Sequence, residues 1–428
     1  MRTAITVVVF VGAYTLIATE WVHRVIVALT GAGLLLGLQV ITVEDAFSSE
    51  RTGVDWNVIL LLLGMMIIVG VIRQTGLFEY LAIWSAKRAR GRPFTILVLL
   101  SLITAVASAL LDNVTTVLLV APVTVLIAER LGTSPVPLLI AEVMASNIGG
   151  TATLVGDPPN ILIGSEAGLS YADFVLNLGP IVLLLLVVFL VLAKVLFRND
   201  LAYHPERVRE VMALDEREAL TRGPLLFRSL AVLAVVTVGF LFHRALGYEP
   251  SVIALLGAGV LLLISRQEPA PFLREVEWPT LLFFMGLFVM AGALVKVGVV
   301  HQLAEWATDF TGGSLLLSTM LLVVLSAPLS AVVDNIPYVA TMAPLVHELA
   351  RTLPGETTVL WWALALGADL GGNATSIGAS ANVVALGVAE RSGYRIRFVE
   401  FLKYGAVVAV TTVALSAGYL WLRYFVLA

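Results

Sequence analysis

The sequence predicts an all-α polytopic membrane protein made of two inverted-topology repeats, with about ten membrane crossings, two re-entrant hairpins and two broken helices. Three observations predict this fold: an apolar composition, an internal duplication, and opposite charge in matching loops. The chain has 428 residues, of which 59% are hydrophobic and 13% are charged, whereas typical soluble domains carry about 25% charged residues. Residues 94–111, 313–333 and 404–422 contain no charge, and such runs match the length of about 17–25 residues needed to cross a hydrocarbon core.

This composition excludes a soluble enzyme, a secreted disulfide scaffold and a nucleic-acid-binding protein. The chain has no cysteine, which excludes disulfides, thiolate metal sites and cysteine nucleophiles, and we expect neither a cofactor nor a bound metal. The pattern G-x-x-x-x-G-K-[ST] does not occur, so the chain alone is not a primary pump. An intramembrane aspartyl protease would need a Gly-x-Gly-Asp motif, which residues 367–370 lack. We therefore do not expect an enzyme.

The two halves of the chain are copies of each other. A shift of 222 residues places Trp56 on Trp278 and Gly76 on Gly298 without a gap. Residues 108–122 then match 330–344 at seven positions, and residues 148–160 match 370–382 at six. Apolar helices resemble one another by chance, but these matches include Trp, Asp, Asn, Pro and paired Gly in one register. We interpret residues 1–197 and 228–428 as two repeats, joined by a cytoplasmic linker, residues 198–227.

Charges in matching loops indicate that the repeats are inverted. Residues 83–93 contain four basic residues, whereas the matching loop near 297–314 has no Lys or Arg and carries two acids. Before the last crossing the bias reverses: residues 164–177 carry only acids, and residues 390–403 carry four basic residues. Because Lys and Arg concentrate in cytoplasmic loops, matching loops must face opposite sides. We expect the inner (plasma) membrane, with residues 83–93 and the linker in the cytoplasm.

The expected crossings of the two repeats lie near 4–21, 25–41, 56–73, 136–163 and 178–197, and near 229–243, 250–265, 278–296, 358–385 and 404–425. Five crossings per repeat is an odd number, which inversion requires. Two further apolar stretches turn at Asp112-Asn113 and at Asp334-Asn335. They are best explained as re-entrant hairpins, since irregular backbone at membrane depth is tolerated only where protein buries it or where it lines a cavity.

Two other apolar stretches contain clusters of Gly, Asn, Thr and Pro that would break a helix. The breaks centre on Gly149-Gly150 and Gly371-Gly372. Matching broken helices are the best sequence indication of a transporter's binding site, although small residues also allow close helix packing. We expect the solute or ion to bind polar side chains at the breaks and hairpin tips: Asn113, Asn147, Thr151, Thr153, Asn160, Asn335, Asn373, Thr375, Ser376 and Asn382.

Acidic residues at membrane depth are costly and are therefore functional candidates. Asp112 and Asp334 match each other, and each either carries a proton or caps its hairpin tip. Glu142, Asp157 and Asp369 instead match Leu364, Ala379 and Asn147. The coupling candidates are Asp112, Asp334, Asp369 and Glu142. Asp369 is the first choice because it adjoins the second break, whereas Glu142 has the alternative of pairing across helices.

These motifs resemble the ion transporter superfamily that contains the ArsB arsenite permeases, the NhaD sodium/proton antiporters, the P-protein group and the divalent-anion/sodium symporters. The resemblance covers nearly the whole chain, and its most specific parts are residues 112–122, 145–164 and 334–337. It implies a scaffold and a transport domain in each protomer, hairpins at the two Asp-Asn pairs, and a homodimer. The ArsB and P-protein branch is the most similar.

The resemblance leads to the hypothesis of a secondary active transporter that exports arsenite or antimonite in exchange for protons. Without cysteine, As(OH)3 would be held by hydroxyl and carboxamide hydrogen bonds. The alternatives are a Na+/H+ antiporter and a transporter of organic or inorganic anions. A passive channel and a separate ATPase subunit also stay open. Sodium/dicarboxylate members carry Ser-Asn-Thr at both hairpin tips, and this chain does not, which argues against sodium-coupled carboxylate transport.

Overall fold

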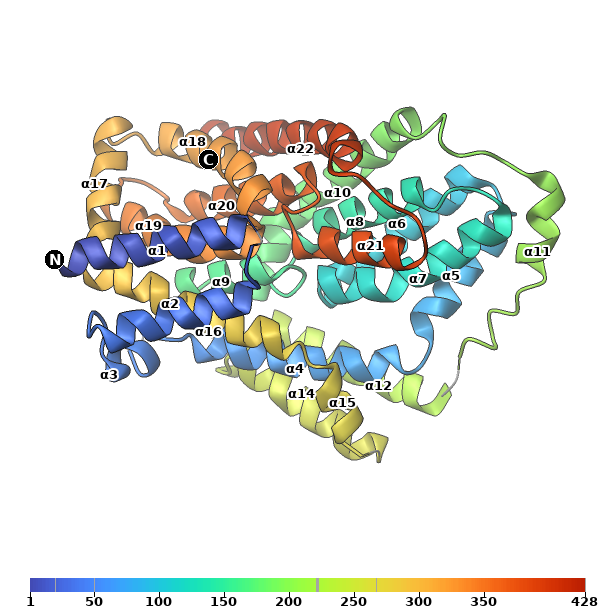
Figure 1. Cartoon of the computed structure of the whole chain (residues 1–428), viewed down its shortest axis with the longest axis horizontal. Helices are drawn as coiled ribbons and strands as arrows, with labels where there is room; N and C mark the ends of the chain where they lie inside the picture. The colour runs from blue at the N-terminus through green and yellow to red at the C-terminus, as the bar shows by residue number, and fades with distance from the viewer. Residues whose placement is uncertain (20, 50, 221–222, 267, 428) are drawn as a thin grey trace.

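The computed structural model describes residues 1–19, 21–49, 51–220, 223–266 and 268–427. These residues are helical or in loops and include no strand, so the predicted all-α membrane fold is confirmed. Eight helices of this part of the chain are long and apolar enough to cross a membrane, and four shorter apolar helices accompany them. Figure 1 shows the helices lying mostly along the long axis of the molecule.

The helices of the first repeat and the linker are α1 (Arg2–Ala18), α2 (Arg24–Gly37), α3 (Val43–Phe47), α4 (Trp56–Arg73), α5 (Leu77–Arg88), α6 (Pro93–Leu110), α7 (Asn113–Leu131), α8 (Val136–Gly150), α9 (Pro158–Ala167), α10 (Tyr171–Leu196), η1 (Pro205–Arg207) and α11 (Val208–Met212). Those of the second repeat are α12 (Gly223–Leu241), α13 (His243–Leu246), α14 (Pro250–Ser265), α15 (Ala270–Glu275), α16 (Trp278–Lys296), α17 (Val299–Phe310), α18 (Leu315–Val333), α19 (Asn335–Thr352), α20 (Thr358–Gly371), η2 (Gly372–Ala374), α21 (Ser380–Arg391), α22 (Phe398–Trp421) and η3 (Leu422–Val426).

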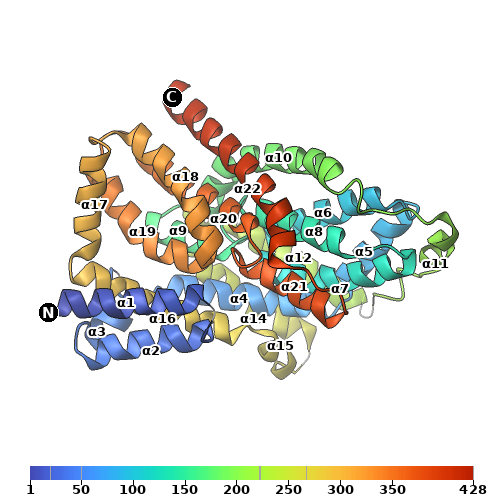
Figure 2. The same cartoon turned by 45° about the horizontal axis from the view of Figure 1, so that its top comes forward.

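The duplication is visible in how matching helices begin. Gly76 precedes α5 with a φ of 76°, and Gly298 precedes α17 with a φ of 78°. Only glycine adopts this left-handed conformation at little cost, so both repeats turn the chain in the same way at the same position. The two helices nevertheless lie at opposite ends of the molecule in both views (Figures 1 and 2). This arrangement is the inversion that the loop charges predict.

Helices of the two repeats pack against each other in two pairs, formed by α2, α4, α14 and α16. Helix α4 packs along α14, and the matching helix α16 packs along α2. Glycine allows both contacts: a Cβ at Gly64 would lie 2.7 Å from the backbone of Ala254, and one at Gly286 would lie 2.7 Å from that of Ala28. Each repeat therefore supplies one helix to each of two tightly packed pairs.

The hairpins α6–α7 and α18–α19 pack against the first parts of the broken helices, α8 and α20. Here too the backbones touch. A Cβ at Gly149 would lie 2.2 Å from the carbonyl oxygen of Ala105, and one at Gly371 would lie 2.5 Å from that of Ala327. Side chains reinforce both contacts, since Ser108 and Ser330 donate hydrogen bonds of 2.8 and 2.7 Å to carbonyls of the broken helices. Small residues thus join each hairpin to the broken helix of its own repeat.

The arms of the predicted hairpins are as long as full crossings. Helices α6, α7 and α18 have 18, 19 and 19 residues, long and apolar enough for a full crossing. Their tips nevertheless end in the middle of the molecule (Figure 1). Sequence length alone could not separate such an arm from a crossing, because an 18-residue helix spans about 27 Å in either case.

The described part of the linker, with η1 and α11, lies at the same end of the molecule as α5 (Figure 1). Lys87 at the end of α5 forms an ion pair of 2.5 Å with Glu216 and donates to the carbonyl of Leu214. The bond from Lys87 lowers the pKa of the Glu216 carboxyl, so this pair is intact at neutral pH and is lost only as the pH falls through the lowered pKa. Residues 83–93 and the described part of the linker therefore lie on the same side of the protein. The limits of the two repeats stay a prediction.

Replacing Gly149 with Ala should destabilise the protein, because the new methyl group would meet the backbone of α6. Overpacking of this kind costs about 1–3 kcal/mol. Gly33→Ala is the matched control, since a Cβ at Gly33 meets nothing within 4 Å. Thermal unfolding in detergent should show a lower midpoint for Gly149→Ala alone. Equal midpoints for the two variants would contradict the close contact of α6 and α8.

Candidate transport site

Four helices begin in the middle of the molecule, where the two hairpin tips and the two breaks meet: α7, α9, α19 and α21. Helix α7 packs against α21 and α19 packs against α9, so each hairpin contacts the broken helix of the other repeat. A helix N-terminus carries a partial positive charge and unpaired N–H groups. Asp112, Asp157 and Asp334 occupy the N-cap positions of three of these helices, and Ala379 occupies the fourth. Carboxylates thus balance most of the positive potential.

Asp157 joins the two hairpin tips. Its carboxylate accepts a hydrogen bond of 2.7 Å from the amide of Asn113, on the first tip. Both of its oxygens also accept from the amide of Asn335, on the second tip, at 3.2 Å. Asp157 is 1% exposed, so these bonds form away from water. One carboxylate of the first break therefore holds both repeats together at the centre.

Asn147, near the end of α8, connects the first tip with the second break. Its oxygen accepts from Asn113 at 3.2 Å. Its amide donates to the side-chain oxygens of Asn373 and Asn382, both at 3.0 Å. The Asn113 oxygen and the Asn373 amide nitrogen are buried and have no hydrogen-bond partner. An open acceptor and an open donor thus lie on either side of Asn147.

A second set of predicted site residues holds the breaks in shape. The amide of Asn160 donates to the carbonyls of residues 150, 151 and 153, and the amide of Asn382 donates to those of residues 372 and 375. Thr153 and Thr375 donate to the matching carbonyls of Ala109 and Ala331, and Thr151 donates to the carbonyl of Asn147. These bonds satisfy backbone groups that the broken helices leave open. We assign these four residues with paired roles, Asn160, Asn382, Thr153 and Thr375, to shaping the breaks.

Asp369 is fully buried, and neither of its carboxylate oxygens has a hydrogen-bond partner. Its polar neighbours are Thr151 and Asn160. Thr151 and Asn160 both carry donor groups, but neither forms a hydrogen bond to the carboxylate. A buried carboxylate without a donor is costly, so this group is a candidate to hold a proton or a cation. Asp369 also feels the charge of Asp157.

The remaining predicted residues lie at the edge of this site or outside it. Glu142 accepts a hydrogen bond of 2.5 Å from Thr124 on α7, and its other oxygen has no partner. It therefore pairs across helices, apart from the four helix starts. Ser376 is buried within the second break. Gly150 and Gly372 lie where each break folds back on itself, against the carbonyls of Gly156 and Gly378.

A cavity of about 550 Å³ reaches the second hairpin tip. Arg24 lines it and binds Asp334 at 3.2 Å, and Glu277 and Ser380 also line it. A smaller neighbouring cavity adds Asp112 to the same surroundings. Arg24 and Glu277 are not among the site residues that the sequence predicts. Arg24 carries a usable signal, since it is the first residue of α2 and the rest of that helix has no charge.

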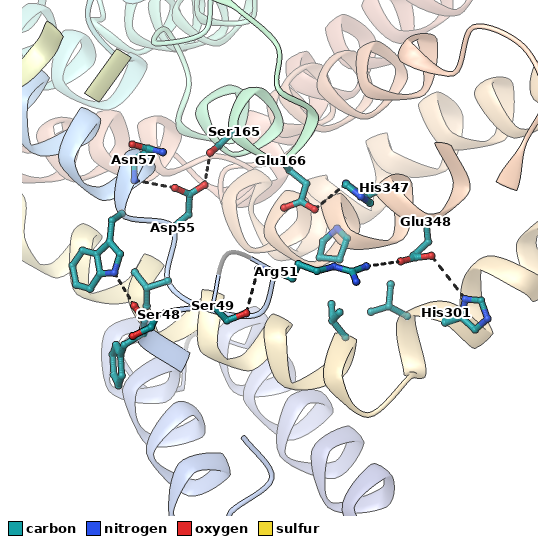
Figure 3. Close-up of a pocket in the computed structure, with 16 residues that line it drawn as sticks. Ser48, Ser49, Arg51, Asp55, Asn57, Ser165, Glu166, His301, His347 and Glu348 are labelled. Atoms are coloured by element: carbon teal, nitrogen blue, oxygen red, sulfur yellow. Dashed lines mark hydrogen bonds and ion pairs between the residues drawn. The ribbon is translucent and has the colours of Figure 1, made fainter. Parts of the chain in front are cut away.

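A second cavity, of about 530 Å³, lies where α9, α17, α19 and the loop after α3 meet (Figure 3). Ion pairs cross it from Glu166 to His347 at 3.2 Å and from Arg51 to Glu348 at 3.7 Å. Ser165 donates to Asp55, the N-cap residue of α4. These contacts anchor the far end of α9, the helix that carries Asp157 at its start.

Within the part of the chain that the structure describes, no three His, Cys, Asp or Glu residues are arranged to hold a metal ion. The polar centre consists mainly of carboxamide and carboxylate groups. Such groups can hydrogen-bond a polar solute, and they can bind a proton or a monovalent cation.

The sequence pattern that defines the citrate transporter family, CitMHS, matches residues 14–367. The chain belongs to this family. An uncharacterized transporter of Mycobacterium bovis is 56% identical, with 99% of each chain covered. The 46 kDa membrane protein of Mycobacterium leprae is 54% identical, also over 99% of each chain. The chain is thus a membrane transporter by family, and the printed names of these relatives state no substrate.

The resemblance to the P-protein group is confirmed. The human P protein is 33% identical over 99% of this chain, which spans 60% of the length of that protein. Among solved structures, the YdaH transporter of Alcanivorax borkumensis matches 94% of this CitMHS chain with a TM-score of 0.65 and 15% identity. MtrF of Neisseria gonorrhoeae matches 92% with a TM-score of 0.63 and 14% identity. At these identities the structures support the fold alone.

Asp157→Ala should destabilise this CitMHS protein, because the amides of Asn113 and Asn335 would lose a shared acceptor. A buried unsatisfied group costs about 1–3 kcal/mol. Asp309→Ala, at an exposed position of α17, is the control. The midpoint of thermal unfolding should fall for Asp157→Ala and not for the control. If both variants unfold at the parent temperature, Asp157 does not hold the hairpin tips together.

Proposed function

We propose that this protein is a secondary active transporter of the plasma membrane that exports a small uncharged polar solute, arsenite or antimonite, in exchange for protons. The observation that carries the proposal is the buried carboxyl of Asp369, which has no hydrogen-bond partner and lies between the two breaks. A proton on Asp369 would remove the uncompensated charge from this buried group. When that proton leaves, the carboxylate needs the donors of Thr151 and Asn160 in the other break, so protonation and the arrangement of the breaks depend on each other.

The charge around the centre favours a solute without negative charge. The acids that surround the site or its cavity, within the described part of the chain, are Asp112, Asp157, Asp334, Asp369 and Glu277. Arg24 forms an ion pair with one of them, Asp334. An anion would have to overcome this excess of carboxyl groups. A neutral trihydroxy solute such as As(OH)3 could instead use the open acceptor of Asn113 and the open donor of Asn373.

The inverted repeats supply a means of alternating access. Because matching elements face opposite ends of the molecule, a rearrangement in one repeat opens a path to one side, and the matching rearrangement opens the other. The bonds from Asp157 and Asn147 cross between hairpins and breaks, so the solute would bind where the two repeats meet.

Purified protein in proteoliposomes tests this proposal. An imposed pH gradient should drive arsenite accumulation, about tenfold for one proton exchanged down one pH unit, because that proton supplies about 1.4 kcal/mol. Asp369→Asn should abolish this accumulation. Asp309→Asn is the matched control at an exposed position. Solute counterflow without a gradient should persist in Asp369→Asn, because the amide keeps the shape of the carboxyl. No arsenite flux in the parent protein rejects the solute, and an unchanged pH dependence in the variant rejects Asp369.

The second candidate function is transport of an organic anion such as citrate. The family pattern is described as a citrate transporter. The start of α21, where Ala379 and not a carboxylate is the N-cap residue, and Arg24 would provide positive potential for carboxylate groups. In the same liposomes, uptake of citrate together with an absence of arsenite flux would favour this candidate. A sodium gradient that changes the internal pH would instead favour a Na+/H+ antiporter.

A further inference from the structure

The two hairpin tips carry the same Asp-Asn pair in different conformations. Asp112 has a φ of −158°, an ordinary extended value, and accepts a hydrogen bond of 2.7 Å from the backbone N–H of Thr115. Asp334 has a φ of 82°, which is unfavourable for a residue with a side chain, and its contact with the N–H of Ile336 is longer, 3.4 Å. The second tip is therefore strained, and neighbouring groups must stabilise it.

Arg24 and Ser380 supply this stabilisation. The Arg24 guanidinium lies 3.2 Å from a carboxylate oxygen of Asp334 and donates to the hydroxyl of Ser380 at 2.7 Å. The Ser380 hydroxyl in turn donates to Asp334 at 2.8 Å. The three side chains form a closed set of contacts. They connect α2, the tip between α18 and α19, and the start of α21.

The first repeat has no equivalent of this triad. A shift of 222 residues places Leu246 opposite Arg24 and Pro158 opposite Ser380. Neither residue has a side chain that can pair with Asp112. The triad is thus a difference between two otherwise matching halves, and it coincides with the strain at Asp334.

Arg24 lies on α2, one helix of the α2–α16 pair, and not on the hairpins. Helix α2 packs along α16, and the guanidinium lies 5.3 Å from the ring centre of Phe283 on α16. Its side chain is 32% exposed, facing the cavity of about 550 Å³, whereas that of Asp334 is 14% exposed. The ion pair is therefore partly shielded from water, and water or a cation can still reach it.

We propose that Arg24 is a positioning residue that acts as a releasable latch between α2 and the second hairpin tip. While the Arg24–Asp334 pair is intact, the strained tip and the start of α21 are held against α2. A proton on Asp334, or a cation that replaces Arg24, breaks the pair. The tip can then relax towards the extended conformation of Asp112. The latch consists of charged groups of the protein itself, so its opening does not depend on which solute is transported.

Several charged groups besides Arg24 act on Asp334. His23 and Glu277 line the same cavity, and Asp112 lines the adjoining one. Asp157 also feels the charge of Asp334. The acids disfavour the charged form of Asp334, and Arg24 favours it. Without Arg24 there is no ion pair to break, so the latch should be open at every pH.

The absence of cysteine from the chain allows a direct test in the full-length protein. Val383 lies on α21 next to the triad, is 45% exposed and lines the cavity. In a Val383→Cys protein we would measure the rate of reaction with a membrane-impermeant maleimide, with and without Arg24→Gln. Loss of the latch should raise the rate about fivefold, the change expected from an ion pair worth about 1 kcal/mol. Asp334→Asn should have the same effect, and the double variant should add nothing further.

Two controls separate a latch from general loosening. Arg24→Lys keeps a cation and should retain most of the slow reaction, and Arg228→Gln removes an arginine that donates to the carbonyl of Ile264, away from the triad. In the Val383→Cys protein with Arg24 intact, the labelling rate divided by that of a free thiol at the same pH should rise as the pH falls. In the Arg24→Gln variant this rise should vanish. A rate in folded Arg24→Gln equal to that of the parent would overturn the proposal. So would additive effects of Arg24→Gln and Asp334→Asn. Neither readout requires flux, so a failed arsenite assay leaves this test intact.

Discussion

The hydrogen bonds from Asp157 to Asn113 and Asn335 are the contacts on which the centre of this protein depends. They unite three interruptions of helical structure that would otherwise expose open backbone and amide groups inside an apolar protein. A buried carboxylate is costly unless several donors surround it. Here two asparagine amides meet that requirement, one from each repeat. The position of each hairpin tip is therefore set by a residue of the first break, and the two repeats cannot be understood separately.

Symmetry accounts for the framework, and departures from symmetry account for the chemistry. The serine, threonine and asparagine bonds that shape the breaks occur at matching positions in both repeats. Asp157, Asp369 and the Arg24 triad do not. Asn147 donates to two side chains of the second break, whereas neither oxygen of the matching Asp369 has a hydrogen-bond partner. The same fold thus offers a satisfied amide in one repeat and an unsatisfied carboxyl in the other.

The fold was largely predictable from the sequence because duplication and loop charge are strong signals that survive in one chain. The hairpin tips and breaks were likewise visible as Asp-Asn and Gly-Gly pairs in apolar stretches. The roles of single residues were less predictable. Asn160 and Asn382 resembled binding residues, yet their amides are consumed by backbone carbonyls. The asymmetry of Asp157 is visible in the sequence, but its bonds to both hairpin tips are not, and neither is the pairing of Arg24 with Asp334. Their importance arises from contacts with residues far away in the chain, which spacing does not encode.

The glycine contacts between each hairpin and its broken helix have a mechanical consequence. Where backbones touch, no side chain can change rotamer to absorb a small displacement. The pairs α6–α8 and α18–α20 therefore move as two rigid units. A displacement of one hairpin tip must then produce a displacement of similar size at the distant end of its arms. Substitutions remote from the polar centre, along the outer arms, could therefore tune how fast the transporter turns over without touching the residues that contact its solute.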